Sequence, residues 1–230
     1  MGLTRPPALQ MDDGSTGALA EQAGHGGGYM ATAFSAIAMG FSAISFYLSA
    51  LQQPDLEVFI PPTIHYARDG GGDTELFAIP LTITNEGART GTVISMELEV
   101  EDPKEKKSKR YYSAFLGEHP RDGNAIHKQF APLSIPGRGV FTDTVRFYPA
   151  GNPLPKLVTD AGEFTFTLRL NTATPPNPGL IDRIAGNTPP APVKFAMTLP
   201  WISEQQLGFR RATIAMHAKD WKPTAGGVAK

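Results

Sequence analysis

The side chains best able to do acid–base or metal chemistry are scattered along this sequence. The five histidines are His25, His65, His119, His127 and His217. A metal site on one helix needs ligands three or four residues apart, and no two of these histidines have that spacing. None has a carboxylate nearby in a metal-like spacing either. Surface or packing roles are the default interpretation, and His119 with His127, which flank one loop, is the pair to test.

Other reaction chemistries find no support in the motifs. The sequence lacks cysteine, which excludes disulfides, thiolate zinc sites and cysteine nucleophiles. It has no GxSxG motif, and the glycines at 70–72 lie between two expected strands, which is typical of a hairpin turn rather than a phosphate-binding loop. Glu97, Glu99 and Glu101 alternate along one solvated strand face. We therefore predict a protein that is not an enzyme and has no cofactor, metal or small-molecule substrate.

A basic loop is the densest charge cluster. Its members are Lys104, Lys106, Lys107, Lys109 and Arg110. One interpretation is contact with anionic lipid head groups or an acidic partner. The other, which we favour, is a solvated hairpin tip whose charge discourages aggregation. Trp221, between two lysines near the C-terminus, is typical of a membrane interface or a partner contact. The net charge of −1 gives no indication of nucleic-acid binding.

A long apolar stretch must position whatever function the chain has. No charged residue occurs from Tyr29 to Leu51. As a helix this stretch would be about 34 Å long, enough to cross a hydrocarbon core of about 30 Å. A cleaved signal peptide would have a shorter apolar region after a basic start, so we expect a transmembrane helix over 29–52.

The predicted helix has two different faces. One face carries only small side chains, those of Ala31, Ser35, Ala38, Ser42, Ser45 and Ser49. The other carries bulky ones, those of Phe34, Ile37, Phe41, Ile44, Leu48 and Leu51. Small faces let helix backbones approach closely in lipid, and serine hydroxyls facing lipid would go unused. We expect the small face to pack on partner helices; a plain anchor is the alternative.

After the predicted helix, apolar residues recur at every second position. Alternating apolar residues predict about eight strands between residues 55 and 200, separated by turns and prolines, which is typical of an antiparallel sandwich. The segment 203–221 is ambiguous, since Ser203 with Gln206 could cap a helix while residues 212–218 also alternate as a strand. Residues 1–28 form a polar glycine-rich tail, and residues 201–230 a basic C-terminal extension.

Three strand motifs carry a resemblance to a known group. The segments LTITNEG, GEFTFTLRL and VKFAMTLP resemble immunoglobulin-like domains of bacterial membrane and envelope proteins. The resemblance covers about residues 55–200, and TNEG marks a turn after a strand rather than a site. It implies an all-β immunoglobulin-like antiparallel sandwich behind one N-terminal transmembrane α-helix. Because this architecture hosts many functions, it implies no activity.

These observations together predict a structural role. We expect a non-catalytic accessory subunit of a multi-subunit bacterial membrane complex, photosynthetic or respiratory, whose partners are integral membrane subunits and membrane lipid. The alternative is a membrane-tethered ligand-binding or adhesion module that uses the loops 117–127 and 172–192. No lysine or arginine lies between Arg5 and the helix, so charge hardly specifies the topology. We expect a single-pass protein of the bacterial inner membrane with its domain on the periplasmic side.

Overall fold

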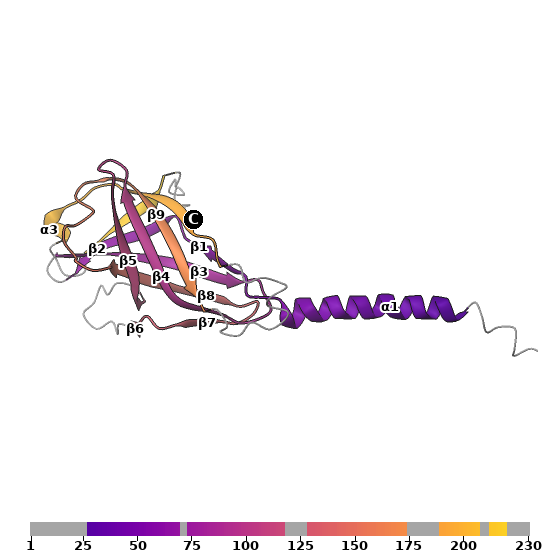
Figure 1. Ribbon diagram of the computed structural model, residues 1–230. Helices are drawn as coiled ribbons and strands as arrows, with labels where there is room; N and C mark the ends of the chain where they lie inside the picture. The colour runs from indigo at the N-terminus through magenta and orange to yellow at the C-terminus, as the bar shows by residue number, and fades with distance from the viewer. Residues whose placement is uncertain (1–26, 70–72, 118–127, 174–188, 208–211, 220–230) are drawn as a thin grey trace, which may run out of the picture. The chain divides into compact units, whose positions relative to one another are not determined.

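The computed structural model describes residues 27–69, 73–117, 128–173, 189–207 and 212–219 (Figure 1). The chain divides into two compact units, Met1–Ser49 and Ala50–Lys230. The first contains helix α1 (Gly27–Phe46), and the turn of π-helix η1 (Tyr47–Leu51) continues from it across the boundary between the units. The predicted helix is therefore confirmed as an element of the fold.

The helix Tyr29–Leu51 is long and apolar enough to cross a membrane, by length and composition. A signal sequence near the N-terminus meets the same criterion. The large apolar side chains of α1, such as Phe34, Met39 and Phe41, are exposed. No described part of the chain covers them.

The described residues of the second unit form eleven strands in one sheet. Their bounds are β1 (Leu56–Phe59), β2 (Thr63–Asp69), β3 (Thr74–Asn85), β4 (Gly91–Asp102), β5 (Lys107–Leu116), β6 (Lys128–Gln129), β7 (Leu133–Ile135), β8 (Val140–Pro149), β9 (Gly162–Thr172), β10 (Val193–Leu199) and β11 (Thr213–Ala218). These strands lie where the alternating pattern predicts them, and β11 lies within the segment that the sequence left ambiguous.

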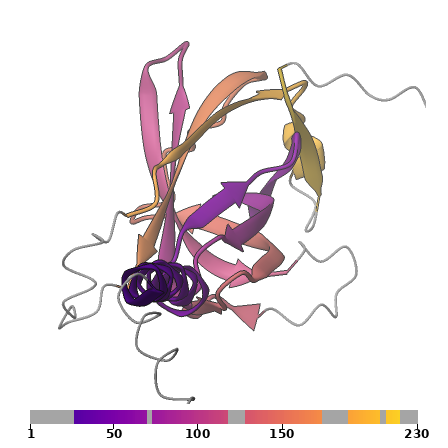
Figure 2. The same cartoon turned by 90° about the vertical axis from the view of Figure 1, so that its right-hand side faces the viewer.

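Eight of these strands close into an antiparallel barrel. The order runs β5-β8-β3-β2-β11-β10-β9-β4, and the pairing of β4 with β5 joins the two ends. Figure 2 shows the strands surrounding a common interior. The prediction of an immunoglobulin-like sandwich over 55–200 is therefore wrong. A sandwich has two sheets with separate edges, whereas here β11 lies between β2 and β10, and β4 pairs with β5.

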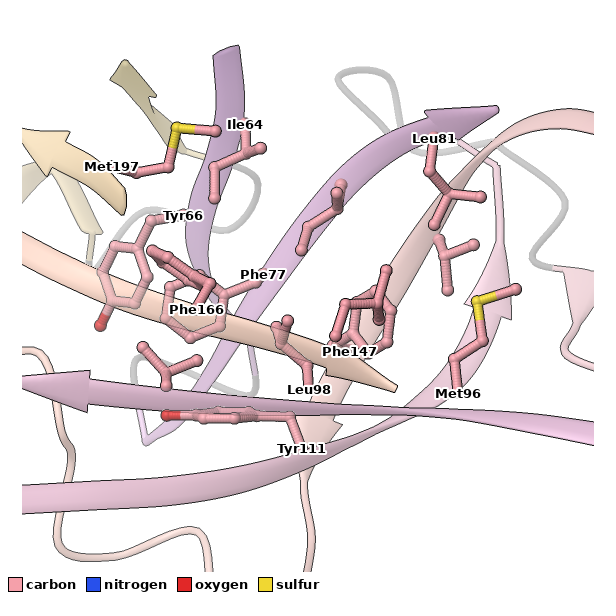
Figure 3. Packing of buried hydrophobic residues seen from close by; sticks show 14 of the residues in the cluster. Ile64, Tyr66, Phe77, Leu81, Met96, Leu98, Tyr111, Phe147, Phe166 and Met197 are labelled. Atoms are coloured by element: carbon pink, nitrogen blue, oxygen red, sulfur yellow. The ribbon is translucent and has the colours of Figure 1, made fainter. Parts of the chain in front are cut away.

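The barrel interior is filled by side chains, not by solvent. The ring of Phe77 lies 5.1 Å from that of Tyr111, 5.3 Å from that of Phe166 and 5.5 Å from that of Tyr66, measured between centroids. Figure 3 shows these rings together with Leu98 and Met197 from other strands. Each such side chain contributes roughly 1.5–3 kcal/mol when fully buried, so this interior is the main source of the fold's stability.

Candidate functional site

The residues of the predicted small face belong to α1 and η1, and two of their hydroxyl groups form hydrogen bonds within the helix. Ser42 Oγ donates a hydrogen bond to the carbonyl oxygen of Ala38 at 2.8 Å. Ser49 Oγ donates to the carbonyl oxygen of Phe46 at 3.2 Å. These hydroxyls are satisfied within their own helix, as is common for serine in apolar helices. The case for packing on this face therefore depends on small side-chain volume rather than on unused hydroxyls.

The predicted basic loop does not form one patch. It covers the β4–β5 turn and the start of β5, and Lys107 Nζ lies 2.6 Å from the carboxylate of Glu105. Lys104 Nζ donates to the carbonyl oxygen of Ala161 at 3.1 Å. Lys106 and Arg110 are exposed, but Lys109 points the other way, with only 15 % of its side chain exposed. Trp221 lies outside the described residues.

Lys109 instead belongs to a buried network centred on Glu75, the first ionisable side chain of β3 and fully buried. The Glu75 carboxylate accepts hydrogen bonds from Tyr111 Oη at 2.7 Å and from the N–H groups of Leu157 and Val158 at 2.8 and 3.2 Å. Lys109 Nζ donates to it at 3.3 Å. These four donors satisfy the carboxylate. Because two of them are main-chain groups that follow β8, Glu75 holds that part of the chain in place.

Arg68 completes this network from β2. It donates through Nε to Tyr66 Oη at 3.0 Å and through Nη2 to the carbonyl oxygen of Val158 at 3.2 Å. Its Nη1 pairs with the carboxylate of Glu204 on the short helix α3 (Glu204–Leu207). The hydrogen bond from Arg68 lowers the pKa of Glu204. Arg68 is 2 % exposed and Glu204 70 % exposed, so the charge of a buried guanidinium is compensated at the surface.

The electrostatics of the network keep its tyrosines protonated. Burial, followed by the negative charge of Glu75, raises the pKa of Tyr111 far above its usual range. Burial likewise raises the pKa of Tyr66, against the hydrogen bond from Arg68. Neither hydroxyl is therefore poised as a base near neutral pH. We call Tyr66, Arg68, Glu75, Lys109 and Tyr111 the plug network, because they fix residues 153–158 against the barrel.

A second polar centre lies at Asn85, at the end of β3, where the side chain is buried. Its Oδ1 accepts the N–H groups of Asp55 at 3.2 Å and Gly87 at 3.1 Å. Its Nδ2 donates to the carbonyl oxygens of Arg89 at 2.8 Å and of residues 135 and 136 at 3.1 Å each. One side chain thus ties together the segment before β1, the β3–β4 turn and the end of β7.

The segment between η1 and β1 is fixed to the same turn. The carbonyl oxygen of Gln52 accepts the N–H groups of Ala88 and Arg89 at 3.2 and 3.1 Å. A Cβ on Gly87 would lie 1.9 Å from the carbonyl oxygen of Gln53, so only glycine allows this approach. We call residues 52–55 and 85–89 the junction. The junction fixes the chain segment that leads into β1 to the β3–β4 turn.

A groove of about 620 Å³ lies beside the junction. It is lined by residues 55–58 on one side and by residues 189–193 on the other, with Glu86 between them. β1 pairs only with β3 in the described part of the chain, and β10 pairs with β11 only at Met197 and Thr198. We call the space between β1 and residues 193–196 of β10 the seam.

The two described histidines, His65 and His217, lie on the neighbouring strands β2 and β11. His217 Nδ1 lies 3.1 Å from Thr63 Oγ1, and His65 is half-buried on the neighbouring strand. His25, His119 and His127 lie outside the described residues, as do most of the loops 117–127 and 172–192 predicted for ligand contact. Within the described ranges there is no group of three histidine, aspartate or glutamate residues that could hold a metal ion.

Sequence reasoning missed the plug network, the junction and the seam. Asn85 had a signal, since it begins the NEG turn that closes a strand, but the pattern indicates only a turn. Glu75 and Lys109 lie 34 residues apart, and only the barrel topology brings them together.

Comparison with known proteins does not identify a family. No family model matches the chain, and no curated protein matches it. Among solved structures, the crystal structure of a candidate ApaA protein from Bordetella pertussis matches 74 % of this chain and 98 % of its own, with 16 % identity and a TM-score of 0.28. At that TM-score the likeness carries no argument about fold or function.

Proposed function

We propose that this chain is a non-catalytic accessory subunit of a multi-subunit membrane assembly, anchored by the single helix Tyr29–Leu51. The observation that carries the proposal is the surface of this helix, which presents small side chains along one face and bulky apolar side chains that no described residue covers. The chain that follows the helix is hydrogen-bonded to the barrel from Gln52 onward.

The helix surface supports packing against partner helices. Its small side chains follow one face, and its bulky side chains are exposed, with no described residue of the chain covering them. Lipid offers no hydrophobic gain to helix association, so close backbone approach along a small face is the main attraction available. The narrower expectation of a photosynthetic or respiratory complex is dropped, because no feature of the described residues supports it.

The buried polar groups of the barrel support a structural role. The plug network uses its ionisable groups to hold residues 153–158, and its tyrosine hydroxyls are kept protonated. These groups contact one another and the main chain.

Replacing Ser35, Ser42 and Ser49 together by leucine tests the packing. Leucine favours membrane insertion, so the protein should still reach the membrane. The added volume should prevent close approach, and the partner proteins that co-purify with the tagged wild-type chain in mild detergent should be lost. The matched control is the triple alanine variant, which keeps the face small, removes the hydroxyls and should retain the same partners.

Equal recovery of partners by the leucine and alanine variants would contradict packing on this face. Loss of partners by both variants would mean that the hydroxyls, not the small volume, carry the association. Quantitative mass spectrometry of the three purified samples distinguishes these results.

We further propose that the chain lies in a bacterial inner membrane with the barrel on the periplasmic side. Because the sequence has no cysteine, one introduced thiol reports the side without background. Glu101→Cys, on the exposed face of β4, should react with a membrane-impermeant maleimide in spheroplasts. Labelling only after the membrane is broken would place the barrel in the cytoplasm.

A further inference from the structure

At its start, where β11 pairs with both β2 and β10, the seam has the width of one strand. β2 and β10 both pair with β11, so they run in the same direction about 9.6 Å apart, twice the strand spacing. β1 lies on the same edge of β3 as β2, because β8 occupies the other edge. The seam therefore begins where β11 ends at Ala218. It continues between β1 and β10 in the direction that β11 would take if it were longer.

Main-chain polar groups face the seam from both flanks. On one side, Asp55 directs its N–H to Asn85 and its C=O to Glu86, so the alternation along β1 turns the N–H and C=O groups of Leu56 and Val58 toward the seam. Within the described residues no strand lies opposite them. Such an unpaired edge is a template for another strand.

The same reasoning applies to β10. Ala218 donates its N–H to the carbonyl oxygen of Pro62 on the β2 side, so the main chain of His217 faces Thr198. Alternation from Thr198 turns the main-chain groups of Ala196 and Lys194 toward the seam. An inserted strand would therefore find hydrogen-bonding groups on both sides, and it would run antiparallel to both.

The floor and rim of the seam define the chemistry of its occupant. Leu56, Val58, Val193 and Phe195 are half-buried and pack against the barrel interior, so they leave part of the core uncovered. Asp55, Glu57 and Glu86 line the mouth and make it acidic. An extended segment with alternate apolar residues, polar residues between them and basic ends matches both features.

The chain's own C-terminal residues match the floor poorly. Ile214 and Met216 face the core from β11, so the inward positions of the same register continue at residues 218, 220 and 222. A strand that continued β11 would therefore direct Asp220 and Lys222 at the uncovered apolar floor. Burying those charges without partners is strongly unfavourable.

We propose that the seam binds an extended segment of a partner protein as an added β-strand between β1 and β10. This is strand addition at a barrel edge, with main-chain hydrogen bonds giving affinity and the alternation of side chains giving register. It goes beyond the proposed function, because it names a contact in the barrel that does not depend on how the helix packs.

The test uses the purified full-length chain in detergent micelles and two synthetic probes. The first is the fluorescein-labelled peptide KTVTVTVK, which alternates valine with threonine; the second is KTTVVVTK, which has the same composition without the alternation. The first probe should bind at least about tenfold more tightly. Equal binding, or no binding by either probe, would overturn the proposal.

Two variants of β1 locate the contact. Val58→Pro removes a main-chain N–H that faces the seam and leaves the pairing with β3 intact; it should weaken binding about tenfold. Val58→Thr keeps that N–H and the side-chain shape, and its affinity should stay within about threefold. Equal affinities for the two variants would overturn the assignment.

Hydrogen exchange of the unsubstituted chain tests the same contact if Val58→Pro does not fold. Saturating KTVTVTVK should protect the amides of Leu56, Val58, Lys194 and Ala196, and protection elsewhere alone would contradict the seam. A chain ending at Lys219 should bind the probe as the full chain does. Binding by the shortened chain alone would identify the C-terminal residues as the natural occupant and overturn the proposal.

Discussion

Asp55 donates its main-chain N–H to Asn85 Oδ1 at 3.2 Å, a contact between residues 30 positions apart. It links the segment before β1 to the end of β3. Because Asn85 also binds the β3–β4 turn and the end of β7, one side chain fixes the first residues after the helix to three parts of the fold. Several hydrogen bonds therefore hold residues 52–55 to the barrel.

Replacing Asn85 by alanine should lower the free energy of unfolding by about 3 kcal/mol, because buried main-chain groups lose their partners. Denaturant unfolding of the full-length chain in detergent measures this change. Asn171→Ala is the control, since Asn171 is exposed and bonds only surface side chains; it should change stability by less than about 0.5 kcal/mol. Equal effects of the two variants would contradict the role assigned to Asn85.

Replacing Glu75 by glutamine should lower the free energy of unfolding by about 3–5 kcal/mol. The buried Lys109 loses its counter-ion, and the amide group of glutamine directs a hydrogen at groups that donate to the carboxylate of Glu75. The matched control is Glu99→Gln on the surface pair with Arg169, which should cost about 1 kcal/mol or less. Thermal unfolding of both variants makes the comparison. A Glu75 variant as stable as the Glu99 variant would show that the plug network does not stabilise the barrel.

Stability should fall as the pH rises above about 10. The pKa of Tyr111 is raised in the folded chain by burial and by the charge of Glu75, so the unfolded chain releases this proton first. The unfolded state then binds fewer protons, and the free energy of unfolding decreases with pH. Tyr111→Phe should make this decrease less steep. Tyr112→Phe, on the same strand, controls for loss of a hydroxyl, and an unchanged slope in Tyr111→Phe would contradict the account.

The sequence predicted the elements of this fold better than their arrangement. Alternation located the strands because each buries one face, and that requirement is the same in a sandwich and in a barrel. Closure depends on pairs far apart in sequence, such as β4 with β9 and β2 with β11. Closure also needs β11. Its short segment TIAMHA has apolar residues at the spacing of a helix as well as that of a strand, so the sequence left this segment ambiguous. No local pattern distinguishes the two architectures.

The candidate sites were predictable only in part. The helix face could be listed from spacing alone, but whether Ser42 and Ser49 satisfy their hydroxyls internally is a matter of rotamers. The basic loop shows the same limit, since adjacent residues of a strand face opposite sides: Lys109 joins the buried network while Arg110 is exposed. Networks built across a barrel have no signature in local sequence.

Site-specific photo-crosslinking from the helix reports whether its small face contacts a partner protein in the membrane. A photoreactive residue at Ala38, on the small face, and one at Ile37, on the bulky face, differ by one position but point in different directions. In membranes of the source organism, the account predicts a crosslink to a partner membrane protein from position 38, and crosslinks to lipid alone from position 37. Crosslinks to lipid alone from both positions would contradict the account of this chain as an anchored subunit of a membrane assembly.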